Sequence, residues 1–374
     1  MLSLDVFRGL IVAGMVLVTN AGSWDHVYWP LKHADWNGVT PTDMIFPSFL
    51  FICGVSMTLS FKARLERGIT AAALRRKAIV RSICLIVLGL LLNGFPFYDL
   101  HDLRIPGVLQ RIGLCYLGAG LFYLAVVQRR KQFRSRALAI AGVIVILLAG
   151  YWALLRFVPV PGYGAGRLDQ VGNFGAFIDR AVFGTNHLWF YSGQMWDPEG
   201  LLSTLTATAN LLLGILTGEW LGKEDLKSGK LLSMAAAGVA LLSAGLVLNS
   251  VIPINKKIWT DSFMLFSGGF SLVALALLGW ALDRRGWRPG ISPALIFGSN
   301  AILGFALANT LNPLESLLHF QIDGHDQTIR GLVFRGLSFM MGPYNASLGY
   351  ALLFVMLILA ILWVFYRNRI FLRL

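Results

Sequence analysis

Apolar residues gather along this chain in about ten long runs, and a polar connection separates each run from the next. Each run has about 20 residues, the length that an α-helix needs to cross the hydrocarbon core of a bilayer. The sequence therefore predicts an all-α, polytopic transmembrane helix bundle. The predicted spans are residues 5–22, 43–61, 78–95, 106–127, 137–157, 200–221, 230–251, 260–282, 291–312 and 346–366.

The composition agrees with lipid as the solvent. Of 374 residues, 56% are hydrophobic and 14% are charged, and the mean hydropathy is +0.66. A soluble domain usually has about 25% charged residues, so this chain has too little polar surface to cover itself in water.

Without an internal repeat or a polar segment of domain length, residues 1–374 are expected to form one domain. The first apolar run lacks a basic segment before it and a small-residue cleavage site after it, so we expect a retained helix.

The connections alternate in charge. One set carries 20 of the 32 Lys and Arg residues: 62–77, 128–136, 222–230, 283–290 and the tail 367–374. The intervening, mostly longer set carries only 8: 23–42, 96–105, 158–199, 252–259 and 313–345. Positively charged loops stay in the cytoplasm during insertion, so both termini are predicted to be cytoplasmic. This topology explains the net charge of +13 without a nucleic-acid partner, and it makes membrane lipid the surroundings of the chain.

Histidines and most acidic residues lie in the second set of connections. All six histidines are there, at positions 26, 33, 101, 187, 319 and 325. Wet loops collect polar residues for no functional reason, which is a sufficient explanation, yet loops held by a rigid scaffold are also common places for active sites. Segment 158–199 is expected to form an ordered cap. The amphipathic stretch from Thr328 to Met341 is expected to be an interfacial or re-entrant helix.

The end of the first span and the loop after it are the most informative stretch. A histidine beside a membrane and near acids, as His33 is, can act as a general base. The amide of Asn20, at the end of the span, can donate to an oxyanion. A purely structural interpretation is equally simple: Asn20 caps a helix, His33 is solvated, and Asp43 caps the second span with Thr40 or Thr42. Spacing alone leaves both interpretations open.

Other polar residues in or beside the spans also have two interpretations. Arg111 lies five residues into the fourth span, where a charge is costly and faces either a cavity or an ion-pair partner. Asp197 and Glu199 precede the sixth span and suit the start of a helix as well as a site. Asn300 is expected to make helix–helix hydrogen bonds. The dispersed histidines show no zinc spacing, so no metal is expected.

Several segments together resemble the heparan-α-glucosaminide N-acetyltransferase family of transmembrane acyltransferases. They occur in the family's order over essentially the whole chain, and the block that begins at His33 is the most specific. Without a lumenal domain before the first span, the chain is similar to the bacterial-type members. The segments are SLDVFRGL (3–10), HADWNGVTPTDMIFPSF (33–49), RIPGVLQRIGLCY (104–116), DPEGLLST (197–204), PINKKIW (253–259) and YRNRIF (366–371).

The resemblance implies transfer of an acetyl group from cytoplasmic acetyl-CoA to the amine of a glucosamine-type sugar on the far side of a bacterial inner (plasma) membrane. It makes His33 catalytic, together with Asn20 and Asp43, and it suggests a homodimer. On this basis the acceptor site is expected to include Asp35, Trp36, Asn37, Arg111, Asp197 and Glu199. The phosphates of acetyl-CoA are expected near the basic residues Arg75, Arg76, Lys77 and Arg81.

Three questions stay open at the level of sequence. His33 can take the proton of the amine directly, or it can carry the acetyl group for part of the reaction. The acceptor can be a hydroxyl instead of an amine. The chain can also be an amino-sugar transporter or permease, although transporters often have inverted halves and none is visible here.

Overall fold

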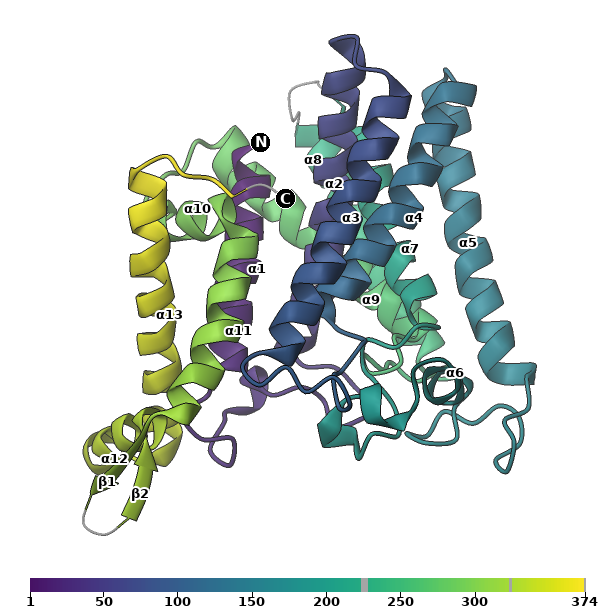
Figure 1. The fold of residues 1–374 in the computed structure, drawn as a ribbon. Helices are drawn as coiled ribbons and strands as arrows, with labels where there is room; N and C mark the ends of the chain where they lie inside the picture. Colours follow the sequence, from purple (N-terminus) through teal and green to yellow (C-terminus); the bar gives the residue numbers. More distant parts are fainter. Residues whose placement is uncertain (223–227, 323–324, 373–374) are drawn as a thin grey trace.

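The computed structural model describes residues 1–222, 228–322 and 325–372, and its secondary structure is almost entirely helical (Figure 1). Short 3-10 turns occur at Trp29–Leu31, Pro41–Met44, Thr185–His187 and Phe190–Ser192, and a π-helical turn at Gly279–Arg284 continues α9. The helices and strands are α1 Leu2–Thr19, α2 Ile45–Glu66, α3 Ala71–Gly94, α4 Val108–Arg129, α5 Phe133–Phe157, α6 Phe174–Phe183, α7 Thr204–Leu221, α8 Ser228–Leu248, α9 Asp261–Leu278, α10 Ser292–Ser299, α11 Ala301–Leu317, β1 His319–Ile322, β2 His325–Thr328, α12 Ile329–Met341 and α13 Pro343–Arg367.

The prediction of an all-α, polytopic bundle is confirmed. Among the described residues, eight helices are long and apolar enough to cross a membrane, and α10 with α11 makes a ninth if the bent pair is one span. The sixth predicted span, 200–221, corresponds to α7, which is helical but is not among these candidates. Its polar residues explain why: Thr206, Asn210 and Glu219 are all buried against neighbouring helices, so this helix does not need an apolar exterior.

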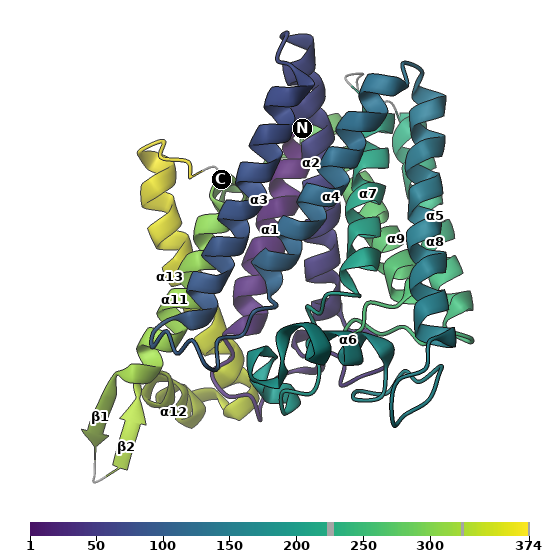
Figure 2. The ribbon, with the colours of Figure 1, turned by 45° about the vertical axis from the view of Figure 1, so that its right-hand side comes forward.

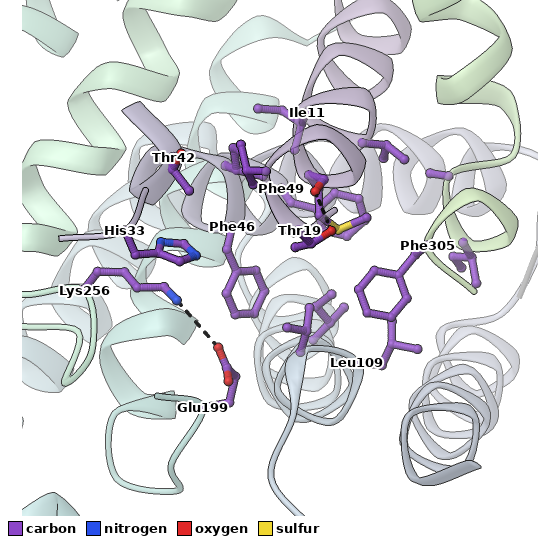
Figure 3. Close-up of a pocket in the computed structure, with 18 residues that line it drawn as sticks. Ile11, Thr19, His33, Thr42, Phe46, Phe49, Leu109, Glu199, Lys256 and Phe305 are labelled. Atoms are coloured by element: carbon purple, nitrogen blue, oxygen red, sulfur yellow. Dashed lines mark hydrogen bonds and ion pairs between the residues drawn. The ribbon is translucent and has the colours of Figure 1, made fainter. Parts of the chain in front are cut away.

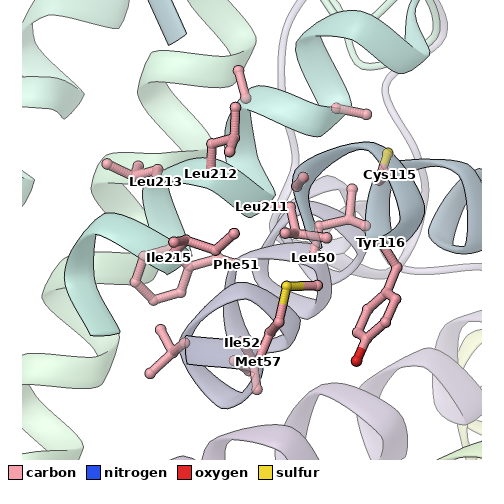
Figure 4. Close-up of a cluster of buried hydrophobic side chains, with 14 of the residues drawn as sticks. Leu50, Phe51, Ile52, Met57, Cys115, Tyr116, Leu211, Leu212, Leu213 and Ile215 are labelled. Atoms are coloured by element: carbon pink, nitrogen blue, oxygen red, sulfur yellow. The ribbon is translucent and has the colours of Figure 1, made fainter. Parts of the chain in front are cut away.

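Helix α7 lies in the interior of the bundle, where it packs against α2, α4, α5 and α9. Figure 4 shows apolar side chains of α2, α4 and α7 meeting there. Leu50 and Phe51 of α2 and Leu211 of α7 have no exposed surface. This is the largest apolar cluster of the molecule, and it fixes the ends of α2 and α4 that face the long connections.

Two glycines let α2 and α7 approach each other closely. A Cβ atom at Gly54 would stand 2.0 Å from the carbonyl oxygen of Leu211, and one at Gly214 would stand 2.0 Å from that of Phe51. Small residues at such contacts allow backbones to touch and gain dispersion energy where lipid provides no hydrophobic driving force between helices.

Gly54→Leu is therefore expected to separate these helices and to lower the free energy of unfolding by about 1–3 kcal/mol or more, as overpacking usually does. The measurement is the midpoint of thermal unfolding in detergent. Gly142→Leu in α5 is the matched control, because nothing lies within 4 Å of a Cβ atom at Gly142. Equal midpoints for the two variants would contradict the close packing.

The ninth predicted span, 291–312, is wrong as a single straight helix. Helices α10 and α11 meet at an angle of 85° at Asn300. The side chain of Asn300 binds the segment after α13: its Nδ2 donates to the Ile370 oxygen at 3.0 Å, and its Oδ1 accepts from the Leu372 nitrogen at 2.9 Å. Asn300 thus bonds to the backbone after α13 and not, as expected, to another helix. Side-chain bonds of this kind offer the backbone an alternative to regular helical hydrogen bonds, which agrees with the break at this residue.

The two ends of the bundle differ in structure. Both termini and the short connections between α2 and α3 and between α4 and α5 lie at one end (Figures 1 and 2). The opposite end carries α6, the β1–β2 hairpin and α12. The predicted amphipathic stretch is helix α12, which Thr328 caps by accepting from the Gly331 nitrogen. The connections that are poor in Lys and Arg therefore gather at the end that holds the candidate site.

Candidate active site

His33 and Asp43 form a direct pair in the loop between α1 and α2. The Nδ1 atom of His33 lies 2.6 Å from Oδ1 of Asp43. Asp43 is fully buried, whereas 40% of the His33 side chain is exposed. Because an ionised carboxylate can only accept, Nδ1 carries the proton and Nε2 keeps a free lone pair. The histidine is thus oriented as a base by a buried acid, an arrangement common to many acyl-transfer sites.

The short turn Pro41–Met44 places Asp43 at the entrance of α2. Its Oδ2 accepts from the Thr40 nitrogen at 2.9 Å, from Thr40 Oγ1 at 3.1 Å and from the Ala34 nitrogen at 3.2 Å. Thr40 and Asp43 form a reciprocal capping box. Asp43 therefore does both: its Oδ2 caps the turn before α2, and its Oδ1 pairs with His33.

A second loop, between α8 and α9, is bound to the loop of His33. The Gly38 nitrogen donates to the Ile254 oxygen at 2.7 Å, and Asn255 Nδ2 donates to Asn37 Oδ1 at 3.1 Å. These bonds fix Lys256 relative to His33, although more than 200 residues separate them in sequence.

A cavity of about 750 Å³, which includes the space at its opening, lies beside His33. Its walls are apolar residues of α1, α2, α4 and α11, and its ionisable side chains are His33, Glu199 and Lys256 (Figure 3). On α1 the lining runs from Thr19 back to Ile11, which at 1.5 Å per residue is a depth of about 12 Å. A slender apolar group can therefore enter between the helices and reach the histidine.

Glu199 belongs to a cluster of charges behind this opening. Arg104 donates to Asp197 at 2.6 and 2.8 Å and to Glu199 at 2.6 Å, and Lys256 Nζ lies 3.9 Å from the other oxygen of Glu199. Burial alone would raise the pKa of Glu199, but the charges of Lys256 and Arg104 outweigh it and lower this pKa to about 2. Glu199 is therefore an anion that balances buried cations at any ordinary pH.

The surroundings of His33 keep its imidazole neutral near pH 7. Loss of hydration among the neighbouring side chains and the positive charge of Lys256 lower the pKa of His33 below its ordinary value of 6.5. The hydrogen bond and the charge of Asp43 act in the opposite direction but are outweighed. A base that is unprotonated at neutral pH can accept a proton there.

The remaining predicted acceptor residues of the first loop, Asp35, Trp36 and Asn37, do not line the cavity. Trp36 donates from Nε1 to the Leu168 oxygen at 2.9 Å and packs edge-on against Trp196. Asn37 holds the α8–α9 loop, as described above, and Asp35 is exposed. The cap 158–199 thus meets the loop of His33 through Trp36.

Asn20 and Arg111 are buried but do not line the cavity. Asn20 Nδ2 donates to the Val16 oxygen at 2.7 Å and to Thr19 Oγ1 at 3.1 Å. Arg111 Nη2 donates to the Gly200 oxygen and to Ser203, and its guanidinium lies 5.1 Å from the ring centroid of Trp259. In this structure both side chains hold helix ends around the site and do not face the open space.

The four predicted phosphate-binding residues of α3 lie in different surroundings. Arg75 donates to Gln128, and Arg76 and Lys77 are exposed. Arg81 is half-buried and lies over the ring of Tyr116, at 4.8 Å from its centroid. Arg75 and Arg81 both contact α4, which also forms a wall of the cavity, but Tyr116 is closer in sequence than Gln128 to the lining residue Ile112.

Sequence reasoning missed Lys256 and Arg104 as members of the site. One signal for Lys256 was available: two adjacent lysines stand in the connection 252–259, although that set of connections is poor in basic residues. Within the part of the chain that the structure describes, no group of three or more His, Cys, Asp or Glu side chains could hold a metal ion.

Comparison with known proteins shows what the chain is similar to. Residues 1–160, which include His33 and Asp43, match the family model "Heparan-alpha-glucosaminide N-acetyltransferase, catalytic". Heparan-alpha-glucosaminide N-acetyltransferases of Mus musculus and Homo sapiens are each 32% identical to the chain over 80% of its length, and the matches cover 52% and 51% of those proteins. The chain thus spans about half the length of these relatives. Residues 1–160 are therefore similar to the catalytic part of heparan-α-glucosaminide N-acetyltransferases, and the similarity to the two relatives extends over most of the chain.

Proposed function

We propose that this protein is a membrane-embedded acetyltransferase that moves an acetyl group from acetyl-CoA to the amine of a glucosamine-type sugar. The observation that carries the proposal is the His33–Asp43 pair at the opening of an apolar cavity between helices. The names of the two relatives support the reaction and the sugar class. The partly exposed His33 ring faces the loop side, from which a polar sugar can approach.

The inner end of the cavity suits the donor. CoA is polyanionic and cannot enter lipid, so its phosphates must stay at the basic end of the bundle while the thin pantetheine arm occupies the cavity. Toward the basic end of the bundle, Arg8 lies about one helical turn from the lining residue Ile11 of α1. Tyr116, whose ring contacts Arg81, lies about one turn from the lining residue Ile112 of α4. We assign the phosphates to Arg8 and Arg81 in place of the exposed residues Arg76 and Lys77.

The test of this function is acetyl transfer by the purified protein in detergent. Labelled acetyl-CoA is mixed with a panel of acceptors: glucosamine, a glycan with terminal glucosamine, and the corresponding hydroxyl sugar. Label on the amine supports the proposal, and label on the hydroxyl sugar alone would replace the acceptor. No transfer to any acceptor would overturn the acetyltransferase function.

One observation favours a transporter as the second candidate. The 85° break between α10 and α11, at Asn300, is the kind of discontinuous helix that transporters use at their binding sites. Flux of labelled glucosamine into proteoliposomes without acetyl-CoA would support the carrier. Flux that needs acetyl-CoA and yields acetylated sugar would support the enzyme.

The sidedness is proposed from the charge of the connections: the site faces away from the cytoplasm of a bacterial plasma membrane. A cysteine introduced in place of His33 is expected to react with an impermeant thiol reagent added outside intact spheroplasts. A cysteine in place of Gln132, exposed in a basic connection, should react only after lysis. The measurement is labelling of each variant before and after lysis, in a background without the three native cysteines. The reverse pattern would invert the topology.

A further inference from the structure

Lys256 is a largely buried residue whose ammonium group opens onto the cavity. Only 8% of the residue is exposed, and it lines the cavity together with His33 and Glu199. Among the described residues its Nζ makes no hydrogen bond to protein, and its ion-pair partner, Glu199, is 3.9 Å away. Glu199 is itself satisfied by Arg104 at 2.6 Å. An ammonium carries three donors, so a group that enters the cavity meets hydrogen-bond donors beside His33.

The position of this group matches a need of the reaction. Attack on a thioester creates a negative charge on the carbonyl oxygen, and a preorganised donor beside that oxygen is commonly the largest contribution to catalysis. Asn20, the predicted donor, has both amide hydrogens in bonds to Val16 and Thr19. Figure 3 shows Lys256 next to His33 on the same side of Phe46, with its Nζ on the cavity side.

Resting on the proposed acetyltransferase function, we propose that Lys256 is a catalytic residue: its ammonium holds the oxyanion of the tetrahedral intermediate, and its positive charge acts on the neighbouring His33. The amine nitrogen forms a bond to the thioester carbon, and the C=O π electrons move to the oxygen beside Lys256. His33 Nε2 removes a proton from that nitrogen. The oxygen electrons then re-form the C=O bond as the C–S bond breaks, the sulfur leaves with the bonding electrons and takes the proton from His33, and amide and thiol are released.

The charges around His33 make this second effect specific. Asp43 stabilises the protonated ring from the side of α2, whereas Lys256 and Lys257 of the α8–α9 loop oppose protonation. Glu199, from the loop before α7, lies on the far side of Lys256, and Asp35 is exposed. Removal of the Lys256 charge leaves Asp43 less opposed, so the imidazole should protonate at higher pH.

The experiment compares Lys256→Met, Lys256→Arg and the exposed control Lys32→Met in full-length protein. Lys256→Met is expected to lower kcat about 10²–10³-fold, with little change in the KM for acetyl-CoA, and to move the acidic limb of the kcat/KM profile to higher pH. Lys256→Arg should recover part of kcat, and Lys32→Met should behave as the wild type. An unchanged kcat and an unchanged limb in Lys256→Met would overturn the proposal.

A second readout does not need activity. Diethyl pyrocarbonate modifies neutral imidazole, so its rate at His33, followed by peptide mass spectrometry across pH, reports protonation of the ring. The midpoint should rise in Lys256→Met and stay in place in Lys32→Met; an unmoved midpoint in folded Lys256→Met would count against the proposal. If the wild type transfers no acetyl group but the midpoint at His33 still rises in Lys256→Met, the acetyltransferase function is wrong. The electrostatic contact between Lys256 and His33 would still be supported.

Discussion

His33→Ala is expected to lower kcat for acetyl transfer by about 10²–10⁴-fold, the usual contribution of a positioned general base. The ring is the cavity-lining group that combines a free nitrogen lone pair with a pKa below 6.5. Without it, the attacking amine has no base at the opening to accept its proton. Because the imidazole makes one side-chain hydrogen bond, to Asp43, its removal should leave the fold nearly intact. The measurement is initial velocity at saturating acetyl-CoA.

The matched control is His101→Ala. His101 lies at the same end of the bundle, is largely exposed, and contacts Asp102 and Asn186 away from the cavity. Its removal should leave kcat within about twofold. Both variants need the wild-type midpoint of thermal unfolding, so that a loss of activity is not a loss of folded protein. Retention of most of the activity in His33→Ala would place the base elsewhere.

The pH at which wild-type kcat/KM falls on the acidic side follows from the same pKa of His33. A base whose pKa is lowered stays deprotonated to lower pH, so kcat/KM should remain on its plateau at pH 7 and fall only below the ordinary value of 6.5. An acidic limb centred above 7 would mean that Asp43 outweighs both Lys256 and the loss of hydration.

The helices were predictable because lipid imposes a simple rule on sequence. A run of about 20 apolar residues is needed for each lipid-facing span, and such runs are visible without knowledge of the fold. Helix α7 satisfies this rule least well because other helices surround it, so protein and not lipid solvates Asn210 and Glu219. The bend at Asn300 depends on the position of the segment after α13, to whose backbone Asn300 bonds. No local sequence pattern around Asn300 indicates that position.

The candidate site was predictable from local spacing at His33 and Asp43 and from the family resemblance at Glu199. His33 and Asp43 are ten residues apart, so their pairing follows from one loop and one turn. Lys256 reaches the same opening through bonds such as Gly38 to Ile254, which connect loops distant in sequence. The cavity is likewise a property of four helices together. Lys256 was therefore missed because tertiary placement, and not local spacing, brings it to the opening.

Asp43→Asn is expected to lower kcat by about 10²–10⁴-fold with almost no change in volume. Asp43 now accepts on both oxygens, from His33 on one and from Thr40 and Ala34 on the other. An amide has one oxygen, and the two backbone donors hold it on their side. Its NH₂ group then faces Nδ1 of His33, which must give up its proton and accept instead. The ring proton moves to Nε2, and the nitrogen that faces the substrate can no longer act as a base.

Thr40→Val separates this tautomer effect from a simple loss of packing. It removes the Thr40 hydroxyl, which donates to the Lys32 oxygen at 2.6 Å and to Asp43 Oδ2 at 3.1 Å, but leaves the carboxylate and its bond to His33, at a cost of about 1–3 kcal/mol in stability. We therefore expect kcat within about tenfold of wild type in Thr40→Val and a far larger loss in Asp43→Asn, at similar unfolding midpoints. Initial velocities with saturating donor and acceptor decide the comparison. Equal losses in the two variants would mean that Asp43 matters as the cap of α2 and not as the partner of the base.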